Sequence, residues 1–86
     1  MKYRLVYTRR AERDIKKLDP PVKRQIRNAI EKLENDPVVS SEKLVDPAIG
    51  TYRFRIGEYR VIFDMEGQDI IVLRVGHRKE IYRRHG

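Results

Sequence analysis

Apolar residues recur along this chain first at strand spacing and then at helix spacing. Residues 3–7 (YRLVY) predict a short strand, and Thr8 directly after them is a residue type that caps helix N-termini. Apolar positions three or four residues apart then predict an amphipathic helix over about residues 8–18. An Asp-Pro-Pro corner follows, and a longer apolar stripe predicts a second, antiparallel helix over residues 20–35.

The hydrophobic pattern returns to strand spacing in the second half of the chain. Residues 51–64 (TYRFRIGEYRVIFD) alternate between apolar and charged on both sides of Gly57 and Glu58. A two-residue loop that begins with glycine favours a type II′ hairpin, which fixes the register of the two strands. After a second turn, residues 69–75 (DIIVLRV) predict a third strand of the same meander.

Together these elements predict an α+β fold in the order β-α-α-β-β-β. We expect a twisted antiparallel-type sheet, with the two-helix hairpin on one face and a short C-terminal helix or tail over residues 77–84. Residues 38–50 mix Ser, Pro and Gly with apolar positions, so they are expected to form an ordered connector. The sequence shows no internal repeat or linker, which predicts a single domain over residues 1–86.

The predicted hairpin places three arginines on one face of the sheet. With Ile56 opposite Tyr59, Arg55 lies directly across from Arg60, and Arg53 shares their face. The other face receives the apolar side chains of both strands, Tyr52, Phe54, Val61 and Phe63. Like charges that face each other across a strand pair destabilise it by about 0.2 to 1 kcal/mol. Two interpretations fit equally well: the arginines are solvated on an open face, or they await an anion.

Composition favours a polyanionic partner. The chain has 86 residues, a formal net charge of +7 and a pI near 10.0, and 13 of its 20 cationic residues are arginine. It contains no cysteine, no apolar run of the roughly 20 residues that span a bilayer, and no N-terminal signal region. We therefore expect a cytoplasmic protein with no membrane association. A charged fraction of 38% is typical of thermophile proteins.

Three motifs, met in order, resemble the RelE-like toxins of the RelE/ParE superfamily. They are Y-R-x-R at residues 52–55, G-x-Y-R-V at 57–61 and V-G-H-R-x-x-I-Y at 75–82, and the resemblance covers most of the chain. It implies a messenger RNA interferase that acts in the ribosomal decoding site and is neutralised by a cognate antitoxin. The implied reaction is attack of a ribose 2′-hydroxyl on the adjacent phosphate, which requires no cofactor and no metal.

The resemblance also implies positions for the catalytic residues. Two basic residues of the family's active strand correspond to Arg53 and Arg55, and the arginine after the hairpin turn corresponds to Arg60. The basic residue after the last strand corresponds to Arg78, and the C-terminal tyrosine to Tyr82. Arginines suit the stabilisation of a phosphorane-like transition state.

Proton transfer is less well specified. Arg53 and Arg55 stand where other family members have lysine, and guanidinium groups stay protonated, so they are poor general bases. His77 is a candidate base, although a histidine that follows a strand is more often a turn or capping residue. Tyr82 is a candidate acid or stacking platform for a base, and its alternative role is to anchor the tail to the core.

Other cations are candidates for contacts with RNA phosphates. In the predicted helices and tail these are Lys16, Lys17, Lys23, Arg24, Arg27, Arg83 and Arg84. The alternative is that they are the solvated faces of amphipathic elements. Two rival functions also remain open: a gyrase-binding toxin of the superfamily's other branch, and a catalytically inactive homologue that binds RNA or antitoxin.

Overall fold

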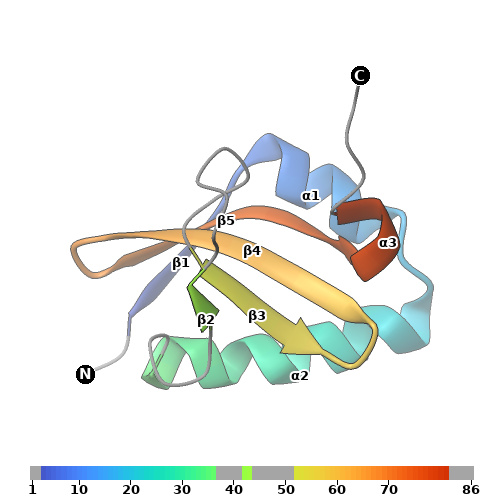
Figure 1. Ribbon diagram of the computed structural model, residues 1–86, viewed down its shortest axis with the longest axis horizontal. Helices are drawn as coiled ribbons and strands as arrows, with labels where there is room; N and C mark the ends of the chain where they lie inside the picture. The colour runs from blue at the N-terminus through green and yellow to red at the C-terminus, as the bar shows by residue number, and fades with distance from the viewer. Residues whose placement is uncertain (1–2, 37–41, 44–51, 82–86) are drawn as a thin grey trace.

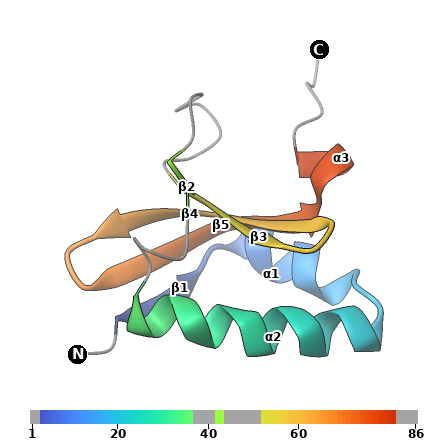
Figure 2. The ribbon, with the colours of Figure 1, turned by 60° about the horizontal axis from the view of Figure 1, so that its bottom comes forward.

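Five strands form one sheet that separates two helices on one face from a short helix on the other. The computed structural model describes residues 3–36, 42–43 and 52–81. The strand order is β1-β5-β4-β3-β2. Figure 1 shows the strands of the sheet side by side, and Figure 2, turned by 60°, shows α1 and α2 packed beneath the sheet and α3 above it. In chain order the elements are β1 (Arg4–Tyr7), α1 (Arg9–Lys16), α2 (Pro20–Asn35), β2 (Glu42–Lys43), β3 (Tyr52–Ile56), β4 (Tyr59–Glu66), β5 (Asp69–His77) and α3 (Arg78–Ile81).

The predicted α+β class and the meander of β3, β4 and β5 are confirmed. Beside the meander, β1 pairs with β5 in parallel, so the sheet as a whole is mixed. Parallel strands need a long connection, and here two helices and three strands separate β1 from β5 along the chain. Of the predicted connector over residues 38–50, only β2 lies within the described residues.

Thr8 joins the first strand to the first helix, as its sequence position predicts. Its Oγ1 accepts a hydrogen bond from the Ala11 backbone N–H at 3.1 Å, which caps α1. The same hydroxyl donates to the Val72 carbonyl at 3.0 Å, so the start of α1 is also fastened to β5. The second helix begins with Pro20 and Pro21 in its first turn, where a missing N–H costs nothing.

The hairpin between β3 and β4 has the predicted register. Arg55 pairs with Arg60 and Phe54 with Val61. Gly57 has a φ of 58°, while no non-glycine residue described by the structure has a positive φ, as a type II′ turn requires. The Gly67-Gln68 turn between β4 and β5 likewise has a glycine first, with a φ of 60°.

A β-bulge interrupts the alternation of side chains along β5. Ile62 pairs with Arg74, but the next residue, Phe63, pairs with Val72, which leaves Leu73 as an extra residue. The bulge inverts the alternation of side chains, so Val72 and Val75 both enter the core although they are three residues apart.

The hydrophobic core fills the space between the sheet and the helices. Ala11 of α1 and Ile26, Ile30 and Leu33 of α2 pack there against the inward side chains of the meander, which are Phe54, Ile56, Val61, Phe63, Ile70, Val72 and Val75. Tyr52 stacks on Phe63 at this face, with ring centroids 5.4 Å apart. No described helix is both long and apolar enough to cross a membrane.

Candidate functional site

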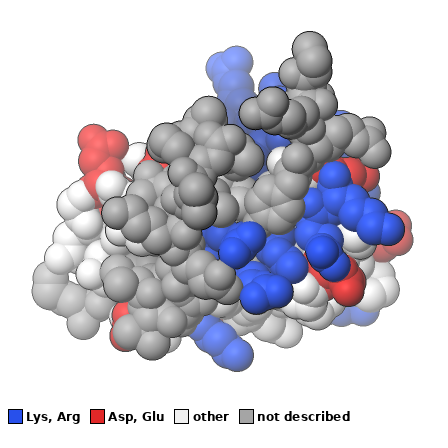
Figure 3. All heavy atoms as spheres, in the orientation of Figure 1, with Lys and Arg blue, Asp and Glu red and all other residues white. Residues whose placement is uncertain are grey.

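Arg53, Arg55 and Arg60 lie together on the sheet face that α1 and α2 leave uncovered. The register gives them this face, because their neighbours Phe54 and Val61 point into the core. Arg55 is exposed, Arg53 is partly buried, and Arg60 is buried. Figure 3 shows Lys and Arg side chains gathered over the hairpin end of β3 and β4 and the adjoining α3. We call Arg53, Arg55 and Arg60, together with Arg78 of α3, the arginine face.

Arg60 is the structural centre of this face. Only 5% of its surface is exposed, and its Nη1 donates to the carbonyl oxygens of Gly57 at 2.7 Å and Tyr59 at 2.8 Å. Its Nε is buried and has no hydrogen-bond partner in the part of the chain that the structure describes. The guanidinium therefore holds the hairpin turn through Nη1, while its Nε is shielded from solvent.

Arg78 approaches the same turn from α3. Its backbone N–H donates to the Glu58 carbonyl at 2.8 Å, and its Nη1 lies 3.6 Å from Glu58 Oε2. Both side chains are more than half exposed, so this ion pair meets the solvent. The first turn of α3 and the hairpin turn are thus tied together, and a cation and a carboxylate sit at their junction.

His77 lies on the opposite face from the arginines. It pairs across the sheet with Tyr59 and makes an edge-to-face contact with that ring, at the side of the core. Its Nδ1 accepts a hydrogen bond from the Lys79 backbone N–H at 3.1 Å, at the start of α3. The structure therefore places His77 in a capping contact at the start of α3 and does not bring it to the arginine face.

The helix-borne cations are separated from the arginine face by the sheet. Lys16 and Lys17 at the end of α1 are exposed, as are Arg24 and Arg27 of α2, and Lys23 is partly buried. They lie on the helices beneath the sheet (Figure 2). Tyr82, Arg83 and Arg84, also predicted as site residues, lie outside the described residues.

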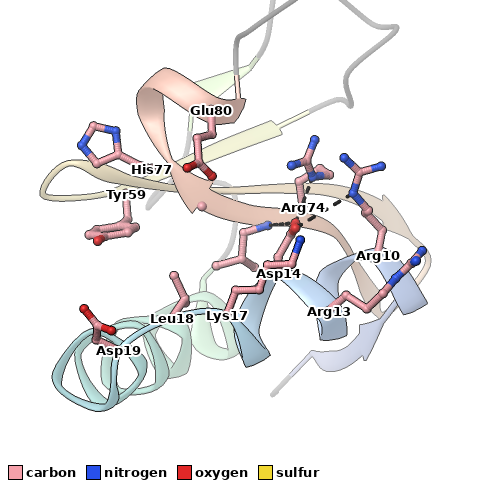
Figure 4. A pocket seen from close by; sticks show the side chains of 12 residues that line it. Arg10, Arg13, Asp14, Lys17, Leu18, Asp19, Tyr59, Arg74, His77 and Glu80 are labelled. Atoms are coloured by element: carbon pink, nitrogen blue, oxygen red, sulfur yellow. Dashed lines mark hydrogen bonds and ion pairs between the residues drawn. The ribbon is translucent and has the colours of Figure 1, made fainter. Parts of the chain in front are cut away.

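The sequence reasoning missed a cluster beside β5, where β1 has ended (Figure 4). Asp14 of α1 reaches the strand edge, and its Oδ2 accepts from Arg74 Nε at 2.9 Å and from the Val75 N–H at 3.0 Å. Arg10 Nε lies 4.0 Å from the other carboxylate oxygen. Arg74 is a charged residue within an otherwise apolar strand, and this irregularity was the sequence signal that could have indicated the cluster.

This cluster lines a cleft of about 450 Å³ between α1, the end of β5 and α3. Exposed Arg13 and Lys17 stand on its α1 wall, and Glu80 and Asp19 also line it. Cations and carboxylates are therefore mixed along the cleft. Within the described residues, no three His, Asp or Glu side chains group as a metal site requires.

A smaller cleft of about 210 Å³ lies between the two helices, at Tyr7. Burial is the main cause that raises the pKa of the Tyr7 phenol above its ordinary value of 10.0. The negative charge of Glu34 raises it further, and Arg27 opposes both effects. Tyr7 is therefore held in its neutral form and belongs to the packing of the helices rather than to the arginine face.

Comparison with known proteins gives consistent matches over nearly the whole chain. A family model described as the ParE toxin of the type II toxin-antitoxin system parDE matches residues 5–82. Toxin RelG of Mycobacterium tuberculosis is 34% identical over 98% of this chain and 100% of its own length. Toxin RelE3 of Methanocaldococcus jannaschii is 30% identical over 92% of this chain and 94% of its own. A chain in the crystal structure of the toxin-antitoxin complex RelBE2 from M. tuberculosis superimposes with a TM-score of 0.81 and 28% identity, over 91% of this chain and 100% of that one.

Proposed function

This chain belongs to the RelE/ParE family of type II toxin-antitoxin toxins, and we propose that it is a ribosome-dependent messenger RNA endonuclease. The observation that carries the proposal is the arginine face, where Arg55 and Arg60 face each other directly across two strands. Two guanidinium groups in this arrangement can hold a phosphate between them through charge-assisted hydrogen bonds.

The proposed reaction uses the message's own nucleophile. A ribose 2′-hydroxyl attacks the adjacent phosphorus in line, and the bond to the 5′-oxygen breaks, which gives a 2′,3′-cyclic phosphate and a 5′-hydroxyl. Arg53, Arg55 and Arg78 would hold the scissile phosphate and stabilise the charge that develops on it. Arg60 would contribute through its buried guanidinium and through the hairpin turn that it fixes. Tyr82 would act as the acid for the leaving 5′-oxygen or as a stacking platform.

We also propose two macromolecular partners. A cognate antitoxin would cover the arginine face, and its contact segment should be acidic because it must screen four arginines. Ribosomal RNA would bind the helix-borne cations Lys16, Lys17, Lys23, Arg24 and Arg27, with Arg83 and Arg84 positioning phosphates nearer the site. Replacing Arg24 and Arg27 by glutamine should then lower the slope of log affinity for ribosomes against log salt by about 0.7 to 0.9 for each lost contact.

The test uses antitoxin-free protein, ribosomes that carry a defined message, and mapping of new RNA ends. Arg55→Gln and Arg78→Gln remove charge from exposed side chains and should each lower cleavage at the decoding site by about 10²-fold or more. Arg9→Gln, an exposed arginine at the start of α1, is the matched control and should cleave normally. Intact message on ribosomes that demonstrably bind the wild-type protein would refute the endonuclease and favour an inactive binding homologue.

A second candidate function has one observation in its favour. The matching family model is described as a ParE toxin, and the resembled ParE branch binds gyrase and does no chemistry. Both curated relatives named above are Rel-type toxins, so we rank this function second. Inhibition of DNA supercoiling by gyrase at protein concentrations that leave messages intact would reverse the ranking.

A further inference from the structure

We propose that Glu58 is the general base of this endonuclease, an inference that rests on the proposed function. The proposed reaction needs a group that removes the 2′-hydroxyl proton, and four guanidinium groups cannot supply one because they stay protonated. His77 lies on the other face, with Nδ1 occupied by the Lys79 N–H. A proton acceptor must therefore come from another residue type.

Glu58 is a carboxylate placed at the arginine face. It occupies the turn between Arg55 and Arg60, and its Oε2 lies 3.6 Å from Arg78 Nη1. A phosphate held by Arg78 would lie next to the carboxylate, within reach of a 2′-hydroxyl on the same nucleotide. An ionised carboxylate is only a hydrogen-bond acceptor, so either oxygen of Glu58 could receive the proton.

The turn that carries Glu58 is fixed from both sides. The backbone carbonyl of Glu58 accepts from the Arg78 N–H at 2.8 Å, and the Gly57 carbonyl accepts from Arg60 Nη1 at 2.7 Å. The side chain itself remains 65% exposed. Its backbone is therefore positioned by two residues of the site, while its carboxylate is open to a substrate.

Within the described residues, three other acidic residues lie near this face and are less suitable. Glu42 of β2 pairs with Arg53, three residue pairs from the Ile56–Tyr59 pair that flanks the turn. Asp64 shares the face by alternation along β4, but it lies four residues from Arg60, about 13 Å along the strand. Glu80 of α3 lines the cleft beside α1 instead. Asp64 and Glu80 therefore serve as matched controls.

In the proposed step, the 2′-hydroxyl proton moves to a Glu58 carboxylate oxygen as the bond from the 2′-oxygen to phosphorus forms. The bond from phosphorus to the 5′-oxygen breaks, and this oxygen takes a proton from the acid, for which Tyr82 is the candidate. The Arg78 guanidinium, released from its ion pair with Glu58, binds the phosphate. The products are the cyclic phosphate and the 5′-hydroxyl already described.

The experiment measures single-turnover cleavage on ribosomes by wild-type protein, Glu58→Gln, Asp64→Asn and Glu80→Gln. We expect Glu58→Gln to lose about 10² to 10⁴-fold in rate, and the two controls to lose less than about threefold. Affinity for ribosomes carrying a message with a 2′-deoxy nucleotide at the cleavage site should not fall in Glu58→Gln, because Arg78 then has no ion pair to give up when it binds the phosphate. Glu58→Asp, which keeps a shorter carboxylate, should recover part of the rate.

A second substrate separates a base from an acid. Sulfur in place of the 5′-oxygen leaves without needing a proton, so it rescues the loss of an acid and not the loss of a base. The Glu58→Gln defect should persist with this substrate. Restored cleavage of this substrate by Glu58→Gln would overturn the inference, as would normal cleavage of the ordinary message by that variant. Faster cleavage together with tighter binding would also overturn it, because Glu58 would then only compete with the phosphate for Arg78. A wild-type protein that does not cleave would refute the endonuclease itself, and Glu58 as its base with it.

Discussion

Asp14 stabilises the edge of β5 beyond the end of β1, and its removal should destabilise the fold strongly. One of its carboxylate oxygens accepts from both Arg74 Nε and the Val75 N–H, and only 10% of the Asp14 side chain is exposed. Hydrogen bonds to charged groups contribute about 1.5 to 3 kcal/mol each, and breaking a fully buried ion pair costs about 3 to 5 kcal/mol. Because the Arg74 side chain is 21% exposed, water compensates part of its loss. We expect Asp14→Ala to lower the free energy of unfolding by about 2 to 4 kcal/mol.

Urea unfolding with linear extrapolation measures this loss, and thermal unfolding should show a midpoint lower by on the order of 10 to 30 °C. Asp14→Asn keeps an acceptor for the Val75 N–H and should lose less. Asp69→Ala is the control: its pair with Arg4 has good geometry at 3.0 Å but is exposed, so screening should make the loss much smaller. A loss below about 1 kcal/mol in Asp14→Ala would refute the argument that this carboxylate seals the strand edge.

Three further predictions concern single positions. Because the pKa of Tyr7 is raised in the fold, its stabilising contribution is complete below pH 10.0 and is lost as pH rises through the higher folded value, so the wild type should lose stability on alkaline titration faster than Tyr7→Phe. Gly57→Ala and Gly67→Ala should each lower the free energy of unfolding by about 1 to 2 kcal/mol through their positive φ, but only Gly57→Ala should also lower cleavage. Gly76→Ala should be tolerated, since its Cβ would lie 3.4 Å from Ile81 Cδ1, whereas Gly76→Val should loosen α3 and speed its cleavage by trypsin.

The hairpin could be predicted to the residue because its pattern is local. Alternation around a glycine-first turn specifies both the pairs and the faces, and Arg55 does lie across from Arg60. The parallel pairing of β1 with β5 and the bulge at Leu73 could not be predicted in this way. Both depend on contacts between segments far apart in sequence, which hydrophobic spacing does not encode.

The candidate site likewise has a part that the local sequence pattern predicts and a part that depends on contacts between distant segments. The shared face of Arg53, Arg55 and Arg60 follows from the hairpin alone, and the structure has it. The position of His77 depends on the bulge, which decides which residues of β5 face the helices, so it could not be assigned from alternation. The approach of Arg78 to Glu58 depends on how α3 folds back on the turn, and no periodic pattern reports such a contact.

The arginine face is held in place by the core beneath it rather than by a ligand. Burial of Phe54, Val61 and Phe63 contributes about 1.5 to 3 kcal/mol for each side chain, while the facing arginine pair costs about 0.2 to 1 kcal/mol. A shift of one residue in the register would relieve the arginines but would turn the apolar side chains of one strand outward, either Phe54 of β3 or Val61 and Phe63 of β4. The core therefore outweighs the repulsion by several kcal/mol and keeps the guanidinium groups clustered. An anion that binds there meets charges already in position, so the reorganisation that weakens electrostatic stabilisation in water is largely avoided.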